Sequence, residues 1–204
     1  MTRRVVITGM GVVAPNGVGL AAYEEALRKG ESGIRHVEQM AESKFGCTVA
    51  GVPQGVEERV AEAFEEDELL AMNMSHRYAS LASLEAWLDA GLERPARDGD
   101  SVDWDTGAIL GTGIGGMDTI GAKVIPLTDA GKARRLGSTA VEQVMASGIS
   151  ARISGQFALG NQVTTNSSAC STGTEAIAMG LERIRMGRAE RMLCGGAEAA
   201  SHYI

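Results

Sequence analysis

Four short, largely apolar runs are distributed along the chain, and each ends in glycine or other small residues. Segments with helical periodicity lie between these runs. Short apolar runs bounded by turn residues are typical of strands buried in a parallel sheet. The alternation of strands and helices therefore predicts an α/β fold with a mostly parallel sheet and flanking helices. We predict strands over residues 5–7, 106–110, 163–165 and 191–194.

The helices are predicted from apolar residues spaced three and four apart. In the clearest, residues 75–90, we assign Ser75 as the N-cap and Gly91 as the C-cap. In residues 171–186, three apolar side chains share one face: Ile177, Leu181 and Ile184. The predicted helices cover residues 21–29, 75–90, 139–147, 150–158 and 171–186.

Several stretches lack a strong pattern. Pro126 and Gly131 interrupt residues 121–137, which we predict to be irregular. A weak edge strand is expected near residues 47–52, and residues 93–105 are expected to form a surface loop. The acidic stretch 57–68 is interpreted as a solvated helix face.

Composition excludes several classes of protein. The 204 residues include 19 Lys and Arg against 26 Asp and Glu, a formal net charge of −7. Nucleic acid is therefore not an expected partner. No apolar run approaches the ~18 residues needed to span a bilayer, so no membrane association is expected. The 27 glycines are roughly twice the usual ~7%, which indicates many tight turns or close backbone approaches.

Three cysteines are present, and they form no C-x-x-C pair. They are too few and too scattered for a disulfide framework or a zinc site, so no metal or cofactor is expected. Reduced thiols of this kind fit a cytoplasmic protein. Cys194, in an apolar strand, and Cys47, near the weak edge strand, are interpreted as structural.

Cys170 lies where the third predicted strand runs into a helix, in the sequence SSACSTG. Unpaired backbone N–H groups at a helix N-terminus favour negative charge, and a thiol placed there is a candidate nucleophile. Its own N–H is suited to form half of an oxyanion hole. Small neighbours, including Ala169, leave room for a substrate. The competing interpretation is a buried structural cysteine.

The glycines at 111, 113 and 116 match G-x-G-x-x-G after a strand, which is a feature of dinucleotide-binding folds. Such a motif requires a helix at once and an acidic residue on the next strand, about 20 residues later. Asp129 does not end a convincing strand. A glycine-rich loop lining an active-site wall is therefore the favoured interpretation.

Two further sets of residues stay open at this point. The histidines His36, His76 and His202 could each act as a base, but no spacing links them to Cys170, and we interpret them as surface or packing residues. A basic cluster suits an acidic partner or a phosphate, or is ordinary solvated charge. Its members are Lys123, Lys132, Arg134 and Arg135.

Five motifs in this order resemble the β-ketoacyl-acyl-carrier-protein synthases, the elongating condensing enzymes of fatty-acid synthesis: VVITGMGVVAPNG, GTGIGG, MASG, SSACSTGTEAI and CGGAEA. The resemblance extends over essentially the whole chain. It implies a thiolase-like fold, and this chain corresponds to the N-terminal βαβαβαββ half. We therefore expect residues 1–204 to form a half-domain, with the C-terminal half absent.

The resemblance also implies roles for individual residues. Cys170 would accept an acyl chain from acyl carrier protein as a thioester, which then condenses with decarboxylated malonyl-carrier protein. Gly113, Ile114 and Gly115 would line the acyl pocket, and the residue at Ile114 would limit chain length. Met145 would reach the partner's pocket across a homodimer.

The family's catalytic histidines and lysine lie in its second half, so full activity of this half alone is not expected. Basic residues that dock the carrier protein are missing before residue 75, where Arg77 or the basic cluster would have to substitute. Two other hypotheses are a non-catalytic scaffold or chain-length partner of a complete synthase, and a nucleotide-binding oxidoreductase that uses the loop at Gly111.

Overall fold

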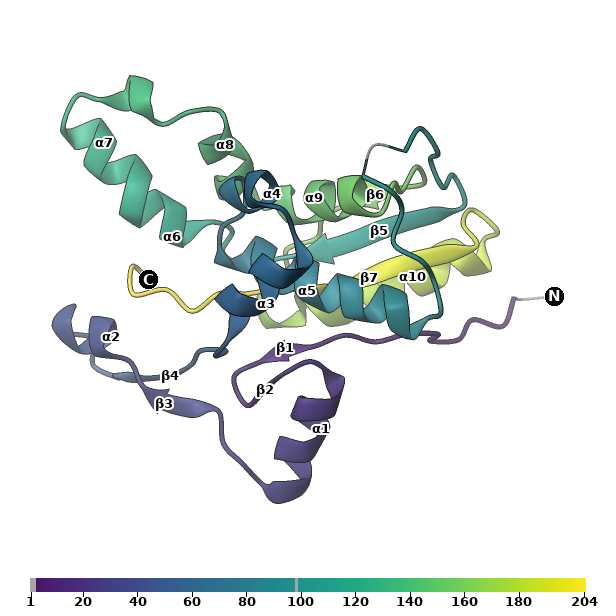
Figure 1. Ribbon diagram of the computed structural model, residues 1–204, viewed down its shortest axis with the longest axis horizontal. Helices are drawn as coiled ribbons and strands as arrows, with labels where there is room; N and C mark the ends of the chain where they lie inside the picture. The colour runs from purple at the N-terminus through teal and green to yellow at the C-terminus, as the bar shows by residue number, and fades with distance from the viewer. Residues whose placement is uncertain (1–2, 98) are drawn as a thin grey trace.

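A three-stranded parallel sheet forms the centre of the protein in the computed structural model, which describes residues 3–97 and 99–204 (Figure 1). Its strand order is β6-β5-β7, comprising Val163–Thr164, Thr106–Gly111 and Arg191–Gly196. Every residue of β5 is buried, as expected of a central strand. The predicted α/β fold with a mostly parallel sheet is confirmed. Asp98, in the predicted loop 93–105, lies outside the described residues.

Two small antiparallel ribbons lie outside this sheet. In the first, β1 (Val13–Ala14) pairs with β2 (Gly17–Val18). In the second, β3 (Ile34–His36) pairs with β4 (Val49–Gly51), which confirms the weak strand predicted near residues 47–52.

The prediction of a buried strand at residues 5–7 is wrong. Ile7 is 74% exposed, and no strand of the described chain pairs with residues 3–12. The backbone after residues 5–7 contacts helix α5 (Met74–Asp89) instead of a strand. The N–H groups of Met10 and Val12 donate hydrogen bonds to two carboxylates on that helix. Gly11 fits directly against it: a Cβ there would lie 1.9 Å from the backbone oxygen of Ala82. The β-branched run is thus extended but unpaired.

The helices fall into three groups along the chain. Those before β5 are α1 (Leu20–Lys29), α2 (Glu38–Glu42), α3 (Val56–Ala63), α4 (Glu66–Leu70) and α5. Those between β5 and β6 are α6 (Met117–Thr119), the π-helical turn η1 (Ile120–Val124), α7 (Ile125–Asp129), the 3₁₀ turn η2 (Ala133–Arg135), α8 (Thr139–Val144) and α9 (Gly148–Gln156). The 3₁₀ turn η3 (Ala169–Ser171) and α10 (Thr172–Arg185) follow β6. In the described part of the chain, no helix is both long and apolar enough to cross a bilayer.

Helix α5 confirms the clearest helix prediction but corrects its cap. The N-cap is Asn73 rather than Ser75, and its side-chain oxygen accepts a hydrogen bond of 3.0 Å from the N–H of His76. This bond satisfies an amide left free in the first turn, which is the usual stabilisation at an N-cap. The C-cap is Ala90 rather than Gly91, and Gly91 directly after it has a φ of +73°, a conformation in which glycine is favoured.

Residues 121–137 are more helical than predicted, because η1 and α7 continue α6 as far as Asp129 (Figure 1). Pro126 is tolerated since it stands in the first turn of α7, directly after the π-helical turn, where a missing N–H is least costly. Gly131, with a φ of +66°, follows the end of this helical arm.

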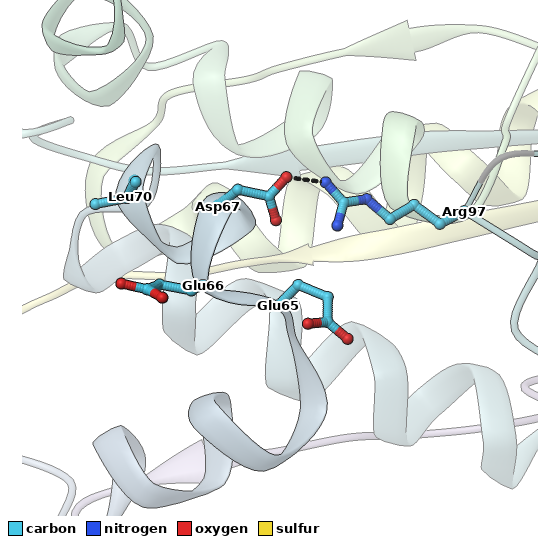
Figure 2. Close-up of a pocket in the computed structure, with 5 residues that line it drawn as sticks. All are labelled: Glu65, Glu66, Asp67, Leu70 and Arg97. Atoms are coloured by element: carbon cyan, nitrogen blue, oxygen red, sulfur yellow. Dashed lines mark hydrogen bonds and ion pairs between the residues drawn. The ribbon is translucent and has the colours of Figure 1, made fainter.

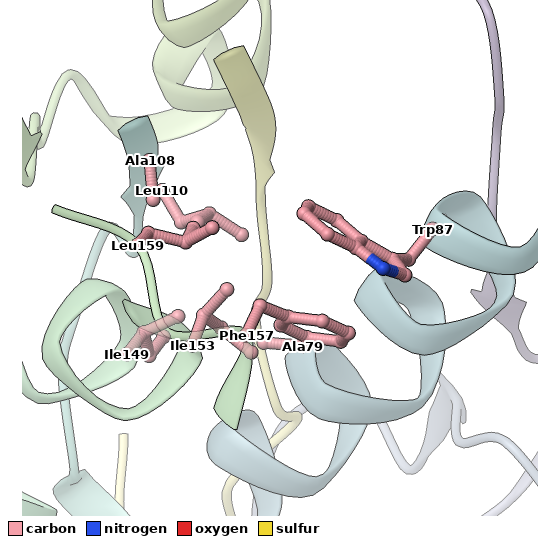
Figure 3. Close-up of a cluster of buried hydrophobic side chains, with 8 residues drawn as sticks. All are labelled: Ala79, Trp87, Ala108, Leu110, Ile149, Ile153, Phe157 and Leu159. Atoms are coloured by element: carbon pink, nitrogen blue, oxygen red, sulfur yellow. The ribbon is translucent and has the colours of Figure 1, made fainter. Parts of the chain in front are cut away.

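One face of the sheet is covered by α5 and α9, which meet over β5 in a core of large side chains (Figure 3). The rings of Trp87 and Phe157 lie 4.9 Å apart at this contact. The cluster consists of Ala79, Trp87, Ala108, Leu110, Ile149, Ile153, Phe157 and Leu159.

Helix α10 covers the opposite face and approaches it more closely. A Cβ at Gly180 would lie 2.3 Å from Sγ of Cys194 on β7. The buried residues of α10 are the small ones: Thr172, Ala176 and Gly180. Ile177, by contrast, is 53% exposed. Leu181 and Ile184, which share the predicted apolar face with Ile177, are half-buried. The residues of α10 that are fully buried are therefore not those of the predicted face, because only small side chains permit this close contact with the sheet.

Candidate active site

Residues 166–173, termed here the Cys170 turn, connect β6 to α10. Its geometry depends on Thr172, whose buried hydroxyl accepts from the N–H of Ser168 at 2.9 Å and donates to the carbonyl of Ala169 at 2.8 Å. The side-chain amide of Asn166 donates to the carbonyl of Thr172 at 2.8 Å. These local bonds close the turn and fix the residues on both sides of Cys170.

Cys170 is exposed at the start of α10, within the 3₁₀ turn η3. The residue before it, Ala169, has a φ of +51°, which is unusual for a residue with a Cβ. Such backbone strain is maintained only where surrounding contacts enforce it, and it is common beside reactive groups. The exposure of Cys170 is inconsistent with a buried structural cysteine.

The glycine loop, residues 111–116, faces the Cys170 turn across the carboxyl end of the sheet. A Cβ at Gly113 would lie 3.5 Å from Cα of Ala169. At Gly111, a Cβ would lie 2.1 Å from the backbone oxygen of Asn166. The absence of side chains at Gly111 and Gly113 therefore lets the two backbones approach closely.

A hollow of about 500 Å³ opens between the glycine loop and the Cys170 turn. It brings together four of the residues predicted to belong to the site: Gly113, Ile114, Ala169 and Cys170. The carboxyl ends of parallel strands are the usual place for a ligand site in an open α/β sheet. The remaining lining residues are Gly111, Thr112, Thr172, Gly173, Gly196, Ala197 and Glu198.

Two other predicted site residues, Gly115 and Met145, are not among the residues that line this hollow. The N–H of Gly115 donates to the hydroxyl of Thr112 at 3.2 Å, and a Cβ at Gly115 would lie 3.0 Å from the carbonyl of Val144. Met145, the next residue, is 51% exposed and does not line the hollow. Gly115 thus joins the glycine loop to the segment that carries Met145.

Glu198 was not among the predicted site residues. It follows β7, and its two carboxylate oxygens accept hydrogen bonds from the hydroxyl of Thr112 and the N–H of Gly113, each at 2.6 Å. The signal available in the sequence was an acidic residue just beyond a predicted strand. Because parallel strands end at the same edge of a sheet, that position brings the carboxylate to the glycine loop.

The other two cysteines differ from Cys170 in environment. Burial raises the pKa of the Cys194 thiol to about 11, which suits a structural residue. Cys47 is exposed, and its thiol donates to the carbonyl of Val49 at 3.6 Å. Neither residue lines the hollow.

The histidines are likewise separate from the hollow. His36 is exposed and lies 3.8 Å from a carboxylate oxygen of Glu38, and the ring of His202 lies 4.0 Å from that of Tyr203. His76 is buried, and burial lowers the pKa of its imidazole. None of the three lines the hollow, so their interpretation as surface or packing residues agrees with the structure.

The glycine loop does not have the context of a dinucleotide site. A helical arm does follow it directly, because α6 is continued by η1 and α7. Asp129 ends a helix rather than a strand. The acidic residue at the end of the next strand, which the dinucleotide motif requires, is therefore missing at Asp129.

A second hollow, of about 580 Å³, lies beside α4 and has an acidic lining (Figure 2). Asp67 forms an ion pair with Arg97, and this bond lowers the pKa of the Asp67 carboxyl. Glu65 and Glu66 are exposed, as predicted for a solvated helix face. This hollow contains no cysteine or histidine, and Asp67, one of its three carboxylates, is held by Arg97.

The basic cluster lies in the segment between the glycine loop and α8, with Lys123 in η1 and the other three residues in or next to η2 (Figure 1). Lys132, Arg134 and Arg135 are exposed. Among the described residues, no carboxylate forms an ion pair with them or with Lys123. These cations are thus accessible to an acidic partner.

Known proteins match this arrangement over nearly the whole chain. The chain is 31% identical over 199 residues to the 3-oxoacyl-[acyl-carrier-protein] synthase 2 of Vibrio harveyi, covering 98% of this chain and 46% of the relative. A β-ketoacyl synthase from Burkholderia phymatum STM815 superposes with a TM-score of 0.82 at 29% identity, covering 98% of this chain and 48% of that one.

A type II polyketide synthase acyl-carrier protein in complex with its ketosynthase gives a TM-score of 0.78 at 26% identity, covering 98% and 46% of the two chains. The chain therefore spans about half the length of the curated relatives it matches. The family model described as "Beta-ketoacyl synthase, N-terminal domain" matches residues 2–204. The chain belongs to the β-ketoacyl synthase family and corresponds to its N-terminal domain.

Proposed function

We propose that this chain provides the acyl-accepting part of a 3-oxoacyl-[acyl-carrier-protein] synthase, with Cys170 as the nucleophile. The observation that carries the proposal is an exposed thiol that lines a hollow at the carboxyl end of a parallel sheet. The exposure of Cys170 also argues against a non-catalytic scaffold or chain-length partner, since such a protein has no need of an accessible thiol at this place.

In the proposed step, the sulfur of Cys170 attacks the carbonyl carbon of an acyl thioester. A new bond forms between this sulfur and the carbonyl carbon, and the bond between that carbon and the carrier's sulfur breaks. The carrier leaves as a free thiol, which takes up the proton that the Cys170 thiol loses. Such covalent catalysis divides the condensation into two easier reactions. Gly113, Ile114 and Gly115 form or support the wall for the acyl chain, Ile114 limits its length, and Ala169 contributes to the site beside the sulfur.

The second step requires malonyl-carrier protein, whose decarboxylation yields the carbanion that attacks the acyl group on Cys170. We assign residues 1–204 as one half-domain of the synthase. In our proposal, the groups that promote decarboxylation lie in the C-terminal half of the synthase fold, outside residues 1–204. This chain by itself is thus expected to accept an acyl group without completing the condensation, in either fatty-acid or polyketide synthesis.

Acyl carrier protein is the proposed macromolecular partner, and the similar ketosynthase–carrier complex supports it. Carrier proteins of this class are acidic, so the exposed Lys132, Arg134 and Arg135 are the candidate docking residues. We also propose a homodimer in which Met145, exposed in this chain, reaches the site of the other subunit. A cytoplasmic location fits the need of Cys170 to remain a reduced thiol.

The test is acylation of the purified protein by an acyl thioester, followed by mass spectrometry of its peptides. We expect one acyl group on Cys170 in the wild type and none in Cys170→Ala. Cys47→Ala is the matched control, because Cys47 is also exposed but lies outside the hollow. Preferential labelling of Cys47 or Cys194 would contradict the proposal.

A further inference from the structure

Three hydrogen bonds connect the end of β7 to the glycine loop. The N–H of Ala197 donates to the carbonyl of Gly111 at 3.0 Å. The carboxylate of Glu198 then accepts from the hydroxyl of Thr112 and the N–H of Gly113, each at 2.6 Å. The backbone of Ala197 and the side chain of Glu198 thus hold three successive residues of the loop, 111–113.

The Thr112 hydroxyl extends this connection. While it donates to Glu198, it accepts from the N–H of Gly115 at 3.2 Å. Thr112 is 2% exposed, so its hydroxyl has little access to water that could replace the carboxylate. Glu198 therefore restrains Gly113 directly and Gly115 through Thr112.

Gly113 is also where the loop meets the Cys170 turn. The position of a Cβ at Gly113 lies 2.8 Å from Oε2 of Glu198 on one side and 3.5 Å from Cα of Ala169 on the other. A displacement of Gly113 would therefore change the separation between the loop and the residue that precedes Cys170. The restraint at Glu198 acts on the width of the hollow beside the sulfur.

We infer that Glu198 is a positioning residue that sets the width of the acyl site, and with it the selectivity of Cys170 among acyl chains of different length. This inference rests on the proposed function of Cys170. Glu198 acts through the glycine loop and takes no part in bond making. Charged hydrogen bonds are stronger and shorter than neutral ones, which suits a carboxylate to holding a loop that lacks side chains.

Variants at Glu198 separate geometry from charge. In Glu198→Gln, the side-chain oxygen still accepts from the N–H of Gly113, and the amide donates to the hydroxyl of Thr112, so the restraint survives without the charge. Glu198→Ala removes both bonds. Thr112→Val removes the bond between the hydroxyl and Glu198, together with the bond that the hydroxyl accepts from the N–H of Gly115, and leaves the bond from the N–H of Gly113 to Glu198 in place. It keeps a side chain of similar volume, so it provides a second variant should Glu198→Ala fail to fold.

The experiment measures acylation of Cys170 by a short and a long acyl thioester in the full-length protein, with alkylation of Cys170 by iodoacetamide as the reference. In Glu198→Ala, we expect the ratio of long-chain to short-chain rates to change about tenfold or more, because both hydrogen bonds to the carboxylate are lost. Alkylation should change less than twofold. Glu198→Gln should restore most of the ratio, and Thr112→Val should fall between wild type and Glu198→Ala.

A ratio unchanged in both Glu198→Ala and Thr112→Val, with the wild type acylated, would overturn this inference alone. The inference would also be overturned if the rates of acylation and alkylation fell by the same factor in Glu198→Ala, since that result would mean that the substitution acts on the reactivity of the Cys170 thiol. Wild-type protein that accepts no acyl group on Cys170 would overturn the proposed function, and this inference with it.

Discussion

The two faces of the central sheet are packed in opposite ways. The face under α5 and α9 is filled by large side chains such as Trp87 and Phe157 (Figure 3). The face under α10 is built from small residues, with Gly180 directly over Cys194. Large side chains bury the most apolar area, whereas small ones bring backbones close together. We interpret the first face as the main source of stability and the second as the one that positions Cys170.

The largest expected effect comes from truncating the core of the first face. Phe157→Ala should lower the free energy of unfolding by about 3–5 kcal/mol, because Phe157 is fully buried and leaves a cavity against Trp87. Urea denaturation measures this loss. Leu88→Ala is the control, since Leu88 is on α5 but 55% exposed, and it should change stability by about 0.5 kcal/mol or less. Equal losses in both variants would contradict the assignment of the core.

Gly180→Ala tests the second face. A methyl group there would lie 2.3 Å from Sγ of Cys194, so α10 must shift, at a cost of about 1–3 kcal/mol. Because Cys170 precedes this helix, we also expect its acylation rate per folded molecule to fall. In Phe157→Ala, that rate should stay close to wild type.

The double variant Gly180→Ala/Cys194→Ala is the control for this steric effect. Removing the thiol makes room for the new methyl group, so at least half of the lost stability should return relative to Cys194→Ala alone. If the two substitutions are simply additive in urea denaturation, the close approach of α10 to β7 does not govern this face.

A smaller effect is expected from His76, which is buried on the α5 side next to Gly148, the first residue of α9. Burial is the main cause of the lowered pKa of its imidazole, Glu142 acts against the shift, and Arg152 adds to it. The unfolded chain then binds a proton more readily than the native one. The contribution of His76 to stability is therefore complete above the unfolded pKa of about 6.5 and is lost as pH falls through the native pKa.

This dependence is bounded at about 1.4 kcal/mol per pH unit for one proton. The free energy of unfolding, measured at several values between pH 5 and 7.5, should decrease with falling pH in the wild type. In His76→Leu, the free energy of unfolding should depend less steeply on pH over this range. The substitution can also lower the free energy of unfolding by an amount that does not depend on pH, which leaves the slope unaffected. An unchanged slope in His76→Leu would exclude His76 as its source.

The comparison of the two faces also explains what the sequence could predict. Strand β5, the glycine loop and the position of Cys170 at the start of a helix all follow from local patterns of apolar, glycine and small residues. The buried face of α10 does not, because its selection depends on how closely the helix approaches β7. Apolar periodicity favoured Ile177, yet the steric demand of Cys194 places Gly180 there.

The remaining discrepancies have the same origin in tertiary contacts. Whether residues 5–7 form a strand depends on a neighbouring strand, and none of the described chain pairs with them. The role of Glu198 depends on the arrangement of β7 beside β5, which brings together residues 112 and 198. Sequence reasoning found the residues carried by local motifs and missed the one whose partners lie far along the chain.

The smallest effect distinguishes two alanines with similar backbone strain. Ala169, beside Cys170, has a φ of +51°, and Ala158, just after α9, has a φ of +53°. Glycine relieves such strain, so Ala169→Gly and Ala158→Gly should each raise the free energy of unfolding by about 1 kcal/mol or less. Only Ala169→Gly should also slow alkylation of Cys170, a few-fold, because the freed turn samples more conformations. If both variants leave alkylation unchanged, the strain at Ala169 is a consequence of the fold, and the Thr172 hydrogen bonds alone position the thiol.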